Sequence, residues 1–188
     1  LLRVDKEEKK EISANFEKKI KLLIRNRIDK FDVVILSDYG KGFLTKSLTK
    51  EIIKISKKNK IPIIVDPNVK DYRKYLGCTV ITPNKLELSL ASGLNCKSDN
   101  EVSKAAKKIK SENKVNYVLV TRSEEGMTLF RPSGKPLTFK SEAREVYDVS
   151  GAGDTVVATL VVILGAGGGM EVAAKISNFA AGLVIAKF

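Results

Sequence analysis

Two apolar runs flank a helical pattern in residues 31–65, which read FDVVILSDYGKGFLTKSLTKEIIKISKKNKIPIIV. The runs Phe31–Leu36 and Ile61–Val65 are of strand length and almost continuously apolar, which predicts two buried strands. Between them, apolar side chains recur at helical spacing, at Leu48, Ile52, Ile53 and Ile55. Buried strands joined by helices are typical of a parallel sheet covered by helices on both sides.

The same alternation continues toward the carboxyl end. We expect further strands at Thr79–Thr82 and Tyr117–Thr121, and a fifth at Met127–Phe130 that pairs back across a turn at Gly126. The predicted fold class is therefore α/β, a three-layer α/β/α sandwich with a mostly parallel sheet. Its first four strands should all run parallel.

Helix-end signals complete this outline. Pro83 suits the first turn of a helix after the third strand, and Ser98 with Glu101 forms a capping box for a helix that reaches about Ser111. Two helices are expected to close the chain, with a glycine-rich turn between them: Thr155–Leu164, Gly165–Gly169 and Glu171–Lys187. The last helix carries apolar side chains on one face: Val172, Ile176, Phe179, Ala180 and Leu183.

The composition limits the classes of function. The chain has 34 Lys and Arg against 22 Asp and Glu, a formal charge of +12. The lysines are spread over several amphipathic segments without interleaved stacking aromatics, which favours solvated helix faces over a nucleic-acid surface. Two cysteines without a paired motif fit a reducing cytoplasm. The longest apolar stretch, residues 156–169, is shorter than the ~20 residues of a membrane helix, and no secretory signal opens the chain.

Ligands of parallel sheets bind beyond the carboxyl ends of the strands. Four predicted loops at that edge carry most of the polar residues of interest: Ser37–Gly42, Asp66–Lys70, Thr82–Glu87 and Thr121–Gly126.

The strongest chemical signal is DVSGAGDT, residues 148–155, directly before a helix. Gly151 and Gly153 allow the backbone to approach a bound group closely, and the free N–H groups of the helix start can hold an anion. Asp154 is a poor phosphate ligand but suits a general base that takes a proton from an attacking hydroxyl. The alternative is that this segment is only a glycine turn with a helix cap.

This segment resembles the D-[TV]-x-G-A-G-D signature of ribokinase-like (pfkB) carbohydrate kinases. The resemblance implies that Asp154 is the catalytic base and that the backbone of Gly151, Ala152 and Gly153 is the anion hole. Asn84-Lys85-Leu86-Glu87 is similar to the N-x-x-E motif of the family, which implies that Asn84 and Glu87 organise Mg²⁺ and phosphate through water. Ordinary helix capping is the alternative for Glu87.

The resemblance to this family also extends to the nucleotide site. The resemblance implies that residues 121–126 form the nucleotide loop, and that Asn178 lies where the last helix passes the adenine of ATP. The expected nucleotide-binding set comprises Asp66, Asn84, Glu87, Thr121, Ser123, Gly126 and Asn178. Two alternatives stay open: Gly126 is only a hairpin glycine, and Asn178 is only an interior polar residue. Lys41 and Lys70 are either phosphate contacts or surface lysines.

Four blocks narrow the resemblance: SDYGKG at 37–42, VDPN at 65–68, TPN at 82–84 and TRSEEGM at 121–127. They look like the kinases that phosphorylate the anomeric hydroxyl of D-glycero-beta-D-manno-heptose 7-phosphate, toward ADP-heptose and the lipopolysaccharide core. The resemblance spans the whole chain and implies ATP, Mg²⁺ and a sugar phosphate as ligands, without nucleic acid or membrane. A homodimer is left open.

Against that family, residues 1–188 correspond to a single partial kinase domain. Residues 1–30 match the end of the lid region and the first helix, and residues 31–188 match the ATP-binding and catalytic core. The amino-terminal part with the first strands, the sugar-holding glycine pair and most of the lid is expected to be missing, as is the end of the last helix–strand region. The chain has no histidine, so an adenylyltransferase site with H-x-G-H is not within it.

Three alternatives remain at this point. The chain is a ribokinase-like kinase for another sugar, or a catalytically silent ATP-site fragment, because the sugar-binding residues of the family lie outside it. A more remote alternative is a basic nucleic-acid-binding module.

Overall fold

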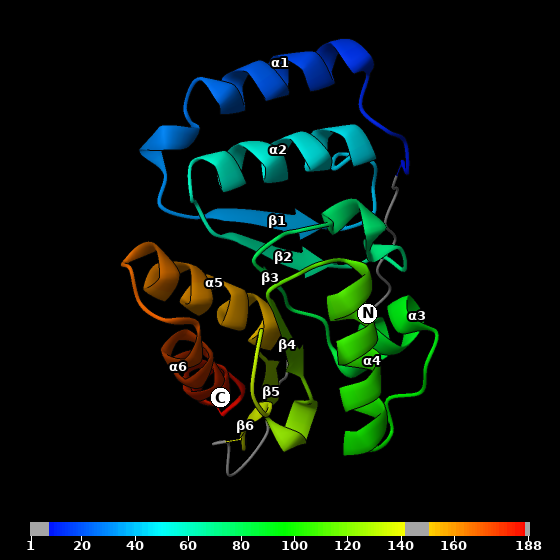
Figure 1. Cartoon of the computed structure of the whole chain (residues 1–188), viewed down its shortest axis with the longest axis vertical. Coiled ribbons are helices and arrows are strands. Elements are labelled where there is room, and N and C mark those ends of the chain that lie inside the picture. Colours follow the sequence, from blue (N-terminus) through cyan, green and yellow to red (C-terminus); the bar gives the residue numbers. More distant parts are fainter. Residues whose placement is uncertain (1–7, 142–150, 187–188) are drawn as a thin grey trace, which may run out of the picture.

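A six-stranded sheet with the order β1-β2-β3-β4-β5-β6 forms the centre of the molecule (Figure 1). The computed structural model describes residues 8–141 and 151–186. The strands are β1 (Val34–Asp38), β2 (Ile63–Pro67), β3 (Val80–Ile81), β4 (Tyr117–Thr121), β5 (Met127–Phe130) and β6 (Leu137–Phe139). The first four strands run parallel, and β5 and β6 are antiparallel to their neighbours. The predicted parallel strands and the antiparallel fifth strand are confirmed.

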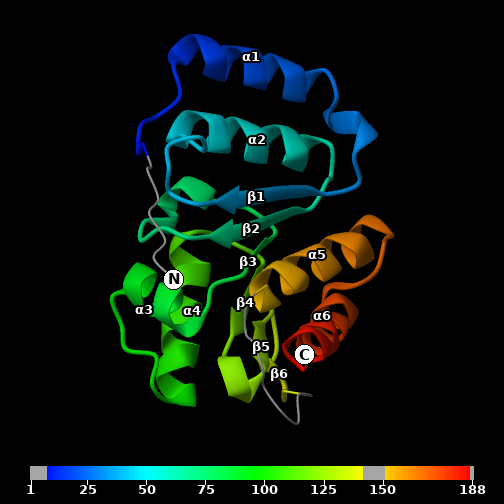
Figure 2. The same ribbon diagram turned by 180° about the vertical axis from the view of Figure 1, so that it is seen from behind.

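Helices cover both faces of this sheet (Figures 1 and 2). They are α1 (Ala14–Arg25), α2 (Lys46–Lys58), α3 (Lys85–Ser92), α4 (Asp99–Glu112), α5 (Ala152–Gly165) and α6 (Met170–Ile185), with short 3-10 helices η1 (Ile28–Lys30), η2 (Tyr72–Tyr75) and η3 (Ser123–Glu125). Strand side chains alternate between the faces. Ile63 and Val65 of β2 therefore join the core under α2 and α4, whereas Ile64 joins the core under α5 and α6. These two cores confirm the three-layer sandwich.

The edge strand β1 differs from its prediction. It begins at Val34 instead of Phe31, because the 3-10 turn η1 and residues 31–33 precede it, and it continues to Asp38. Ile35 is 43% exposed and Phe31 is 55% exposed, so the prediction of a fully buried strand was wrong here. Within the described residues β1 has a strand on one side only, and its outer side lacks the cover that an inner strand receives.

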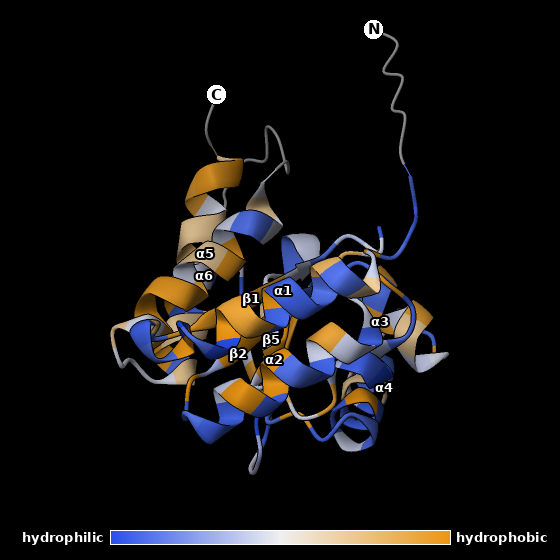
Figure 3. Ribbon diagram, turned by 90° about the horizontal axis from the view of Figure 1, so that it is seen from above, coloured by the Kyte–Doolittle hydropathy of each residue, from blue (hydrophilic) through white to orange (hydrophobic). Residues whose placement is uncertain are grey.

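Helix α6 buries small side chains. Ala173, Ala174 and Ser177 are fully buried against the sheet, and they allow α6 to lie close to α5. The predicted apolar face of this helix exists but points outward: Val172, Ile176, Phe179 and Leu183 are each exposed by 44–55%, and Ala180 is half-buried. Figure 3 shows α5 and α6 as largely hydrophobic ribbons, whereas α1, α2 and α4 carry broad hydrophilic faces.

The start of α3 corrects one helix-end prediction. Asn84 is its N-cap, so Pro83 lies before the helix and not in its first turn. There the Pro83 carbonyl accepts a hydrogen bond of 3.0 Å from the N–H of Thr121 at the end of β4. The capping box of α4, from Ser98 to Glu101, is confirmed, as is the turn between α5 and α6.

Several predictions fall partly outside the described residues. These are the resemblance of residues 1–5 to a lid, the first residues of the glycine signature at 148–150, and Lys187 as the last residue of the final helix. In residues 8–141 and 151–186, no helix has the length and apolar character needed to cross a membrane.

Candidate active site

Two adjoining cavities open at the carboxyl ends of the parallel strands. The first, which we call the acidic cavity, measures about 210 Å³ and is lined by Asp66, Thr82, Asn84, Glu87, Thr121, Gly151, Gly153, Asp154 and Val156. The second, the apolar cavity, measures about 280 Å³ and is lined by Thr121, Ser123, Glu124, Gly126, Met127, Ser141, Ala152, Gly153, Val156, Asn178, Ala181, Gly182 and Ile185. Because Thr121, Gly153 and Val156 line both, the cavities form one elongated cleft.

This cleft brings together the main residues that the sequence predicted as a site. All the catalytic and nucleotide-binding candidates line one cavity or the other, although they are separated by up to 112 positions, from Asp66 to Asn178. Lys41 and Lys70 line neither cavity. They lie in the loops after β1 and β2, and Lys41 lies 5.8 Å from the ring centre of Tyr39. The individual roles of these residues stay predictions.

Helix α5 starts with its backbone open to the cleft. Gly151 is the N-cap with φ +77°, a left-handed conformation that favours glycine. Gly153 has no such constraint, and a Cβ added there would meet no atom within 4 Å among the described residues. Its lack of a side chain therefore leaves space within the cleft. The start of a helix offers unpaired N–H groups and a partial positive charge, which suits an anion.

Asp154 lies in the first turn of α5 and faces the acidic cavity. Its side chain is exposed and makes no hydrogen bond or ion pair within residues 8–141 and 151–186. A capping carboxylate would instead bond to a backbone N–H at the helix start. No such bond is made within the described residues, and the role of Asp154 stays a prediction.

Asn84 and Glu87 form a complete capping box. The Asn84 side chain accepts a hydrogen bond of 2.9 Å from the Glu87 N–H, and Oε2 of Glu87 accepts one of 2.9 Å from the Asn84 N–H. The interpretation of this N-x-x-E segment as a helix cap is thus confirmed. Both residues also line the acidic cavity, so the cap fixes the Glu87 carboxylate at the edge of the cleft.

The carboxylates of the acidic cavity influence one another. Burial raises the pKa of Asp66 above its ordinary value of 3.8, and the charge of Asp154 raises it further, against a hydrogen bond from Thr82. Burial also raises the pKa of Glu87 above 4.5, with a smaller contribution from Asp66. The cavity therefore holds negative charge that is only partly compensated by the protein.

This charge fits a hydrated cation better than a directly bound one. Among the described residues, no cluster of three His, Cys, Asp or Glu side chains is arranged to hold a metal ion. Mg²⁺ keeps several of its waters in proteins and binds through one or two carboxylates together with phosphate oxygens. The residues present are compatible with the predicted contact of Asn84 and Glu87 to Mg²⁺ through water.

A tight loop lines the apolar cavity between β4 and β5. Gly126 has φ +83°, and a Cβ there would overlap the carbonyl oxygen of Phe139 and lie 2.6 Å from the backbone N of Ser141. Gly126 is thus more than a hairpin glycine, because it also permits the chain after β6 to approach. Ser123 has a positive φ of 53°, and its position directs the loop along the cleft.

Asn178 connects α6 to the same chain segment. It is 5% exposed, and its side-chain amide donates a hydrogen bond of 2.7 Å to the carbonyl of Lys140. This contact supports the interpretation of Asn178 as an interior polar residue. Asn178 nevertheless lines the apolar cavity, so the structural and the binding interpretations are compatible.

Sequence reasoning missed two buried charged residues near the cleft. Asp38, at the end of β1, accepts hydrogen bonds from the Tyr75 hydroxyl at 2.6 Å and the Gly40 N–H at 2.9 Å, and pairs with Lys74. Arg122, in the loop directly after β4, is 6% exposed. The available signal was a charged residue at the end of an apolar strand or just after it. Glu125 lies three residues after Arg122, but the partners Tyr75, Lys74 and Asp99 lie far along the chain and gave no local pattern.

Comparisons with known proteins agree with this geometry. The family model described as pfkB family carbohydrate kinase matches residues 7–188. The "Bifunctional protein HldE" of Desulfatibacillum aliphaticivorans is 46% identical over 187 residues, and that of Geobacter sulfurreducens is 40% identical over 187 residues. Each alignment covers 100% of this chain and 38% of the relative, so the chain spans well under half the length of these relatives.

Solved structures share the fold. Arabidopsis thaliana ribokinase complexed with ribose and ATP has a TM-score of 0.74 and 26% identity, over 93% of this chain and 54% of that one. Phosphofructokinase-2 from Escherichia coli in complex with potassium has a TM-score of 0.80 over 94% of this chain and 58% of that one, and at 17% identity it supports the fold alone. Since the family model extends over nearly the whole chain and the mostly parallel α/β sandwich agrees with it, the chain belongs to the pfkB family of carbohydrate kinases.

Proposed function

We propose that this chain is the ATP-handling and catalytic part of a kinase that phosphorylates a sugar hydroxyl. The observation that carries the proposal is the placement of Asp154: its carboxylate faces the acidic cavity, beside the open start of α5, and that cavity continues into the apolar one. A triphosphate attached to a planar base requires the same combination of an anion site and an apolar site within one cleft.

In this proposal the base of ATP lies in the apolar cavity, between the loop at Ser123–Gly126 and the side of α6 that carries Asn178. The phosphates extend past Thr121 toward Gly151 and Gly153, whose backbone N–H groups take the transferring phosphoryl group. The solved ribokinase that is similar to this chain was complexed with ribose and ATP, which supports ATP as the phosphoryl donor.

The proton transfer is assigned to Asp154. Its carboxylate removes the proton of the attacking sugar hydroxyl as the oxygen forms a bond to the γ-phosphorus. The bond between that phosphorus and the bridging oxygen breaks, and its electron pair leaves with ADP. Mg²⁺, when bound, neutralises charge that develops on the phosphate oxygens. We assign Asn84 and Glu87 to hold water molecules of that ion, because their capping box fixes the Asn84 amide and the Glu87 carboxylate in place.

The substrate we favour is D-glycero-beta-D-manno-heptose 7-phosphate, phosphorylated at its anomeric hydroxyl in the cytoplasm toward ADP-heptose. This narrower assignment is supported by the SDYGKG, VDPN and TRSEEGM blocks and by 40–46% identity to bifunctional HldE proteins over the whole chain. Lys41 and Lys70, which lie in the loops after β1 and β2 and line neither cavity, are candidates for contact with the sugar phosphate.

The test uses the complete protein that contains this chain. Purified enzyme is given ATP and Mg²⁺ with heptose 7-phosphate, ribose or fructose as acceptor, and ADP release is measured. We expect turnover with the heptose phosphate to exceed turnover with the other sugars by orders of magnitude. A preference for ribose or fructose would leave the kinase assignment intact and reject the substrate. ATP binding without transfer to any acceptor would identify a silent ATP site instead.

A further inference from the structure

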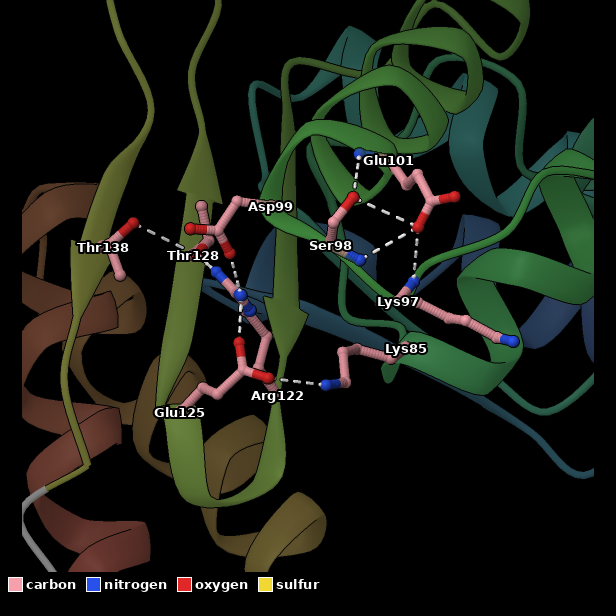
Figure 4. Close-up of polar contacts among 9 residues, drawn as sticks. All are labelled: Lys85, Lys97, Ser98, Asp99, Glu101, Arg122, Glu125, Thr128 and Thr138. Atoms are coloured by element: carbon pink, nitrogen blue, oxygen red, sulfur yellow. Dashed lines mark hydrogen bonds and ion pairs between the residues drawn. The ribbon is translucent and has the colours of Figure 1, made fainter.

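Glu125 lies between two cations that come from different parts of the fold. Its Oε1 accepts a hydrogen bond of 2.7 Å from Nζ of Lys85, the first residue of α3. Its Oε2 pairs with Nη2 of Arg122 (Figure 4). Lys85 and Glu125 are 40 positions apart, so this carboxylate joins two elements that the chain does not connect locally. The hydrogen bond from Lys85, reinforced by the charge of Arg122, lowers the pKa of Glu125, which keeps the carboxylate ionised.

Arg122 anchors the buried side of this arrangement. Its side chain is 7% exposed, and its guanidinium also pairs with Asp99 in the first turn of α4 and donates a hydrogen bond of 3.1 Å to Thr128 of β5. A buried guanidinium requires compensation by carboxylates. Glu125 is the compensating carboxylate that belongs to the nucleotide loop. Its pairing with the buried Arg122 therefore fixes its position in that loop.

The residues beside this link line the cleft. Lys85 directly follows Asn84, which lines the acidic cavity, and Glu125 lies between Glu124 and Gly126, which line the apolar cavity. Glu125 itself lines neither cavity. At the base of the same junction, Thr121 donates a backbone hydrogen bond to Pro83 and forms an isolated β-bridge with Asn84. The side-chain link thus adds a second connection above the backbone one.

Another ion pair between two elements, that of Arg25 and Glu51, lies away from the cleft. Arg25 and Glu51 join α1 to α2 at 2.6 Å, and neither residue nor its immediate neighbours line the acidic or the apolar cavity. The pair resembles that of Lys85 and Glu125 in having a partly exposed carboxylate and a long-range cation. It therefore provides a matched control for the loss of one ion pair without a change near the cleft.

We propose that Glu125 is a positioning residue, which fixes the nucleotide loop against the start of α3 and so sets the spacing between the nucleotide end and the phosphate end of the cleft. This inference rests on the proposed function, because it assigns the two ends to two parts of ATP. Glu125 acts through Ser123 and Gly126 on one side and through Asn84 and Glu87 on the other. Loss of its charge should weaken ATP binding and leave the sugar site unaffected.

The experiment compares Glu125→Gln, Lys85→Met, the double variant and Glu51→Gln in the complete protein. KM values for ATP and for the sugar, the Kd for ATP and the melting temperature are measured for each. We expect Glu125→Gln to raise the Kd and KM for ATP by about fivefold or more, the scale of a charge-assisted hydrogen bond, with less than a twofold change in KM for the sugar. Glu51→Gln should change neither KM.

The double variant tests the connection itself. If Lys85 acts through Glu125, Lys85→Met should add little to the effect of Glu125→Gln on the Kd for ATP, which is the signature of coupled residues. If Glu125→Gln does not fold, Lys85→Met decides alone, because its side chain is 30% exposed and its replacement leaves Arg122 compensated.

Two results would overturn the proposal. One is an unchanged Kd for ATP in both Glu125→Gln and Lys85→Met. The other is an equal rise of KM for ATP and for the sugar, accompanied by a lower melting temperature, which would indicate a purely structural ion pair. Wild-type protein that fails to bind ATP would instead refute the proposed function, and that outcome is read before any variant is compared.

Discussion

Replacement of Asp154 by Asn separates the base from the cap interpretation of the glycine signature. The amide keeps the size and one acceptor oxygen of the carboxylate but cannot take a proton. Loss of a general base lowers kcat by about 10²–10⁴-fold, which corresponds to about 3–5 kcal/mol in the activation free energy. ATP affinity should change by less than tenfold, since the proposed anion site is made of backbone N–H groups.

The free energy of unfolding should respond far less. Asp154 is exposed and has no bonded partner in the described part of the chain, so what it loses is mainly its favourable interaction with the helix dipole, about 0.3–1 kcal/mol. A control is Glu171→Gln, which removes an acidic residue from the first turn of α6 and, with it, the ion pair of Glu171 with Arg131. Asp154→Asn should therefore lose no more stability than Glu171→Gln, and only the Asp154 variant should lose turnover.

The assay is steady-state kinetics of the complete enzyme with saturating ATP, alongside urea unfolding of the same preparations. Retention of wild-type kcat in Asp154→Asn would refute the base assignment. A loss of stability well beyond that of Glu171→Gln, with kcat falling only in proportion to the folded fraction, would show that the carboxylate is structural.

Three further predictions concern the same cleft. Glu87→Gln keeps an acceptor for the Asn84 N–H but removes a charge. The Mg²⁺ concentration for half-maximal rate should therefore rise severalfold, while the free energy of unfolding changes by less than about 1 kcal/mol. An unchanged dependence of the rate on Mg²⁺ concentration would reject the assignment of Glu87 to the hydrated ion. The folded-state pKa values of Asp66 and Glu87 are raised, so the stability that these groups contribute is present below their ordinary pKa values and is lost as pH rises above 3.8 and 4.5. In denaturant unfolding, the free energy of unfolding of Asp66→Asn should therefore fall less between pH 4 and pH 7 than that of the wild type. An identical fall in both proteins would contradict the raised pKa of Asp66. Gly126→Ala should destabilise the fold by about 2 kcal/mol or more, because it combines a positive φ with an overlap at Phe139, and a normal unfolding midpoint would show that the loop can move away.

The sequence predicted the inner strands well because their signal is local. Ile63, Ile64 and Val65 are buried on both faces of the sheet, so every residue of the run is apolar and no other element fits. The ends of the sheet were less predictable. β6 (Leu137–Phe139) was missed because an edge strand of three partly exposed residues lacks a continuous apolar run, and β1 was predicted as buried because sequence alone does not say which strand lies at an edge.

The candidate site was predictable where a motif encodes backbone geometry. Gly151 and Gly126 adopt positive φ values that few other residues tolerate, and these constraints leave a mark in the sequence. Arg122 was not predictable in the same way. Glu125 lies only three residues away, but the other partners, Asp99 and Thr128, come from α4 and β5, and no local pattern indicates that packing brings them to Arg122.

The junction of the two cavities at Thr121, Gly153 and Val156 has a consequence for inhibitor design. A compound that fills only one cavity meets surfaces shared with many nucleotide-binding proteins, whereas one that spans both must pass this junction. A Cβ at position 153 would meet no atom within 4 Å among the described residues, so the glycine leaves space for a linker between the two ends. A bulkier residue there would occupy space that the proposed phosphates need, so it should weaken the binding of ATP together with that of any compound that spans both cavities.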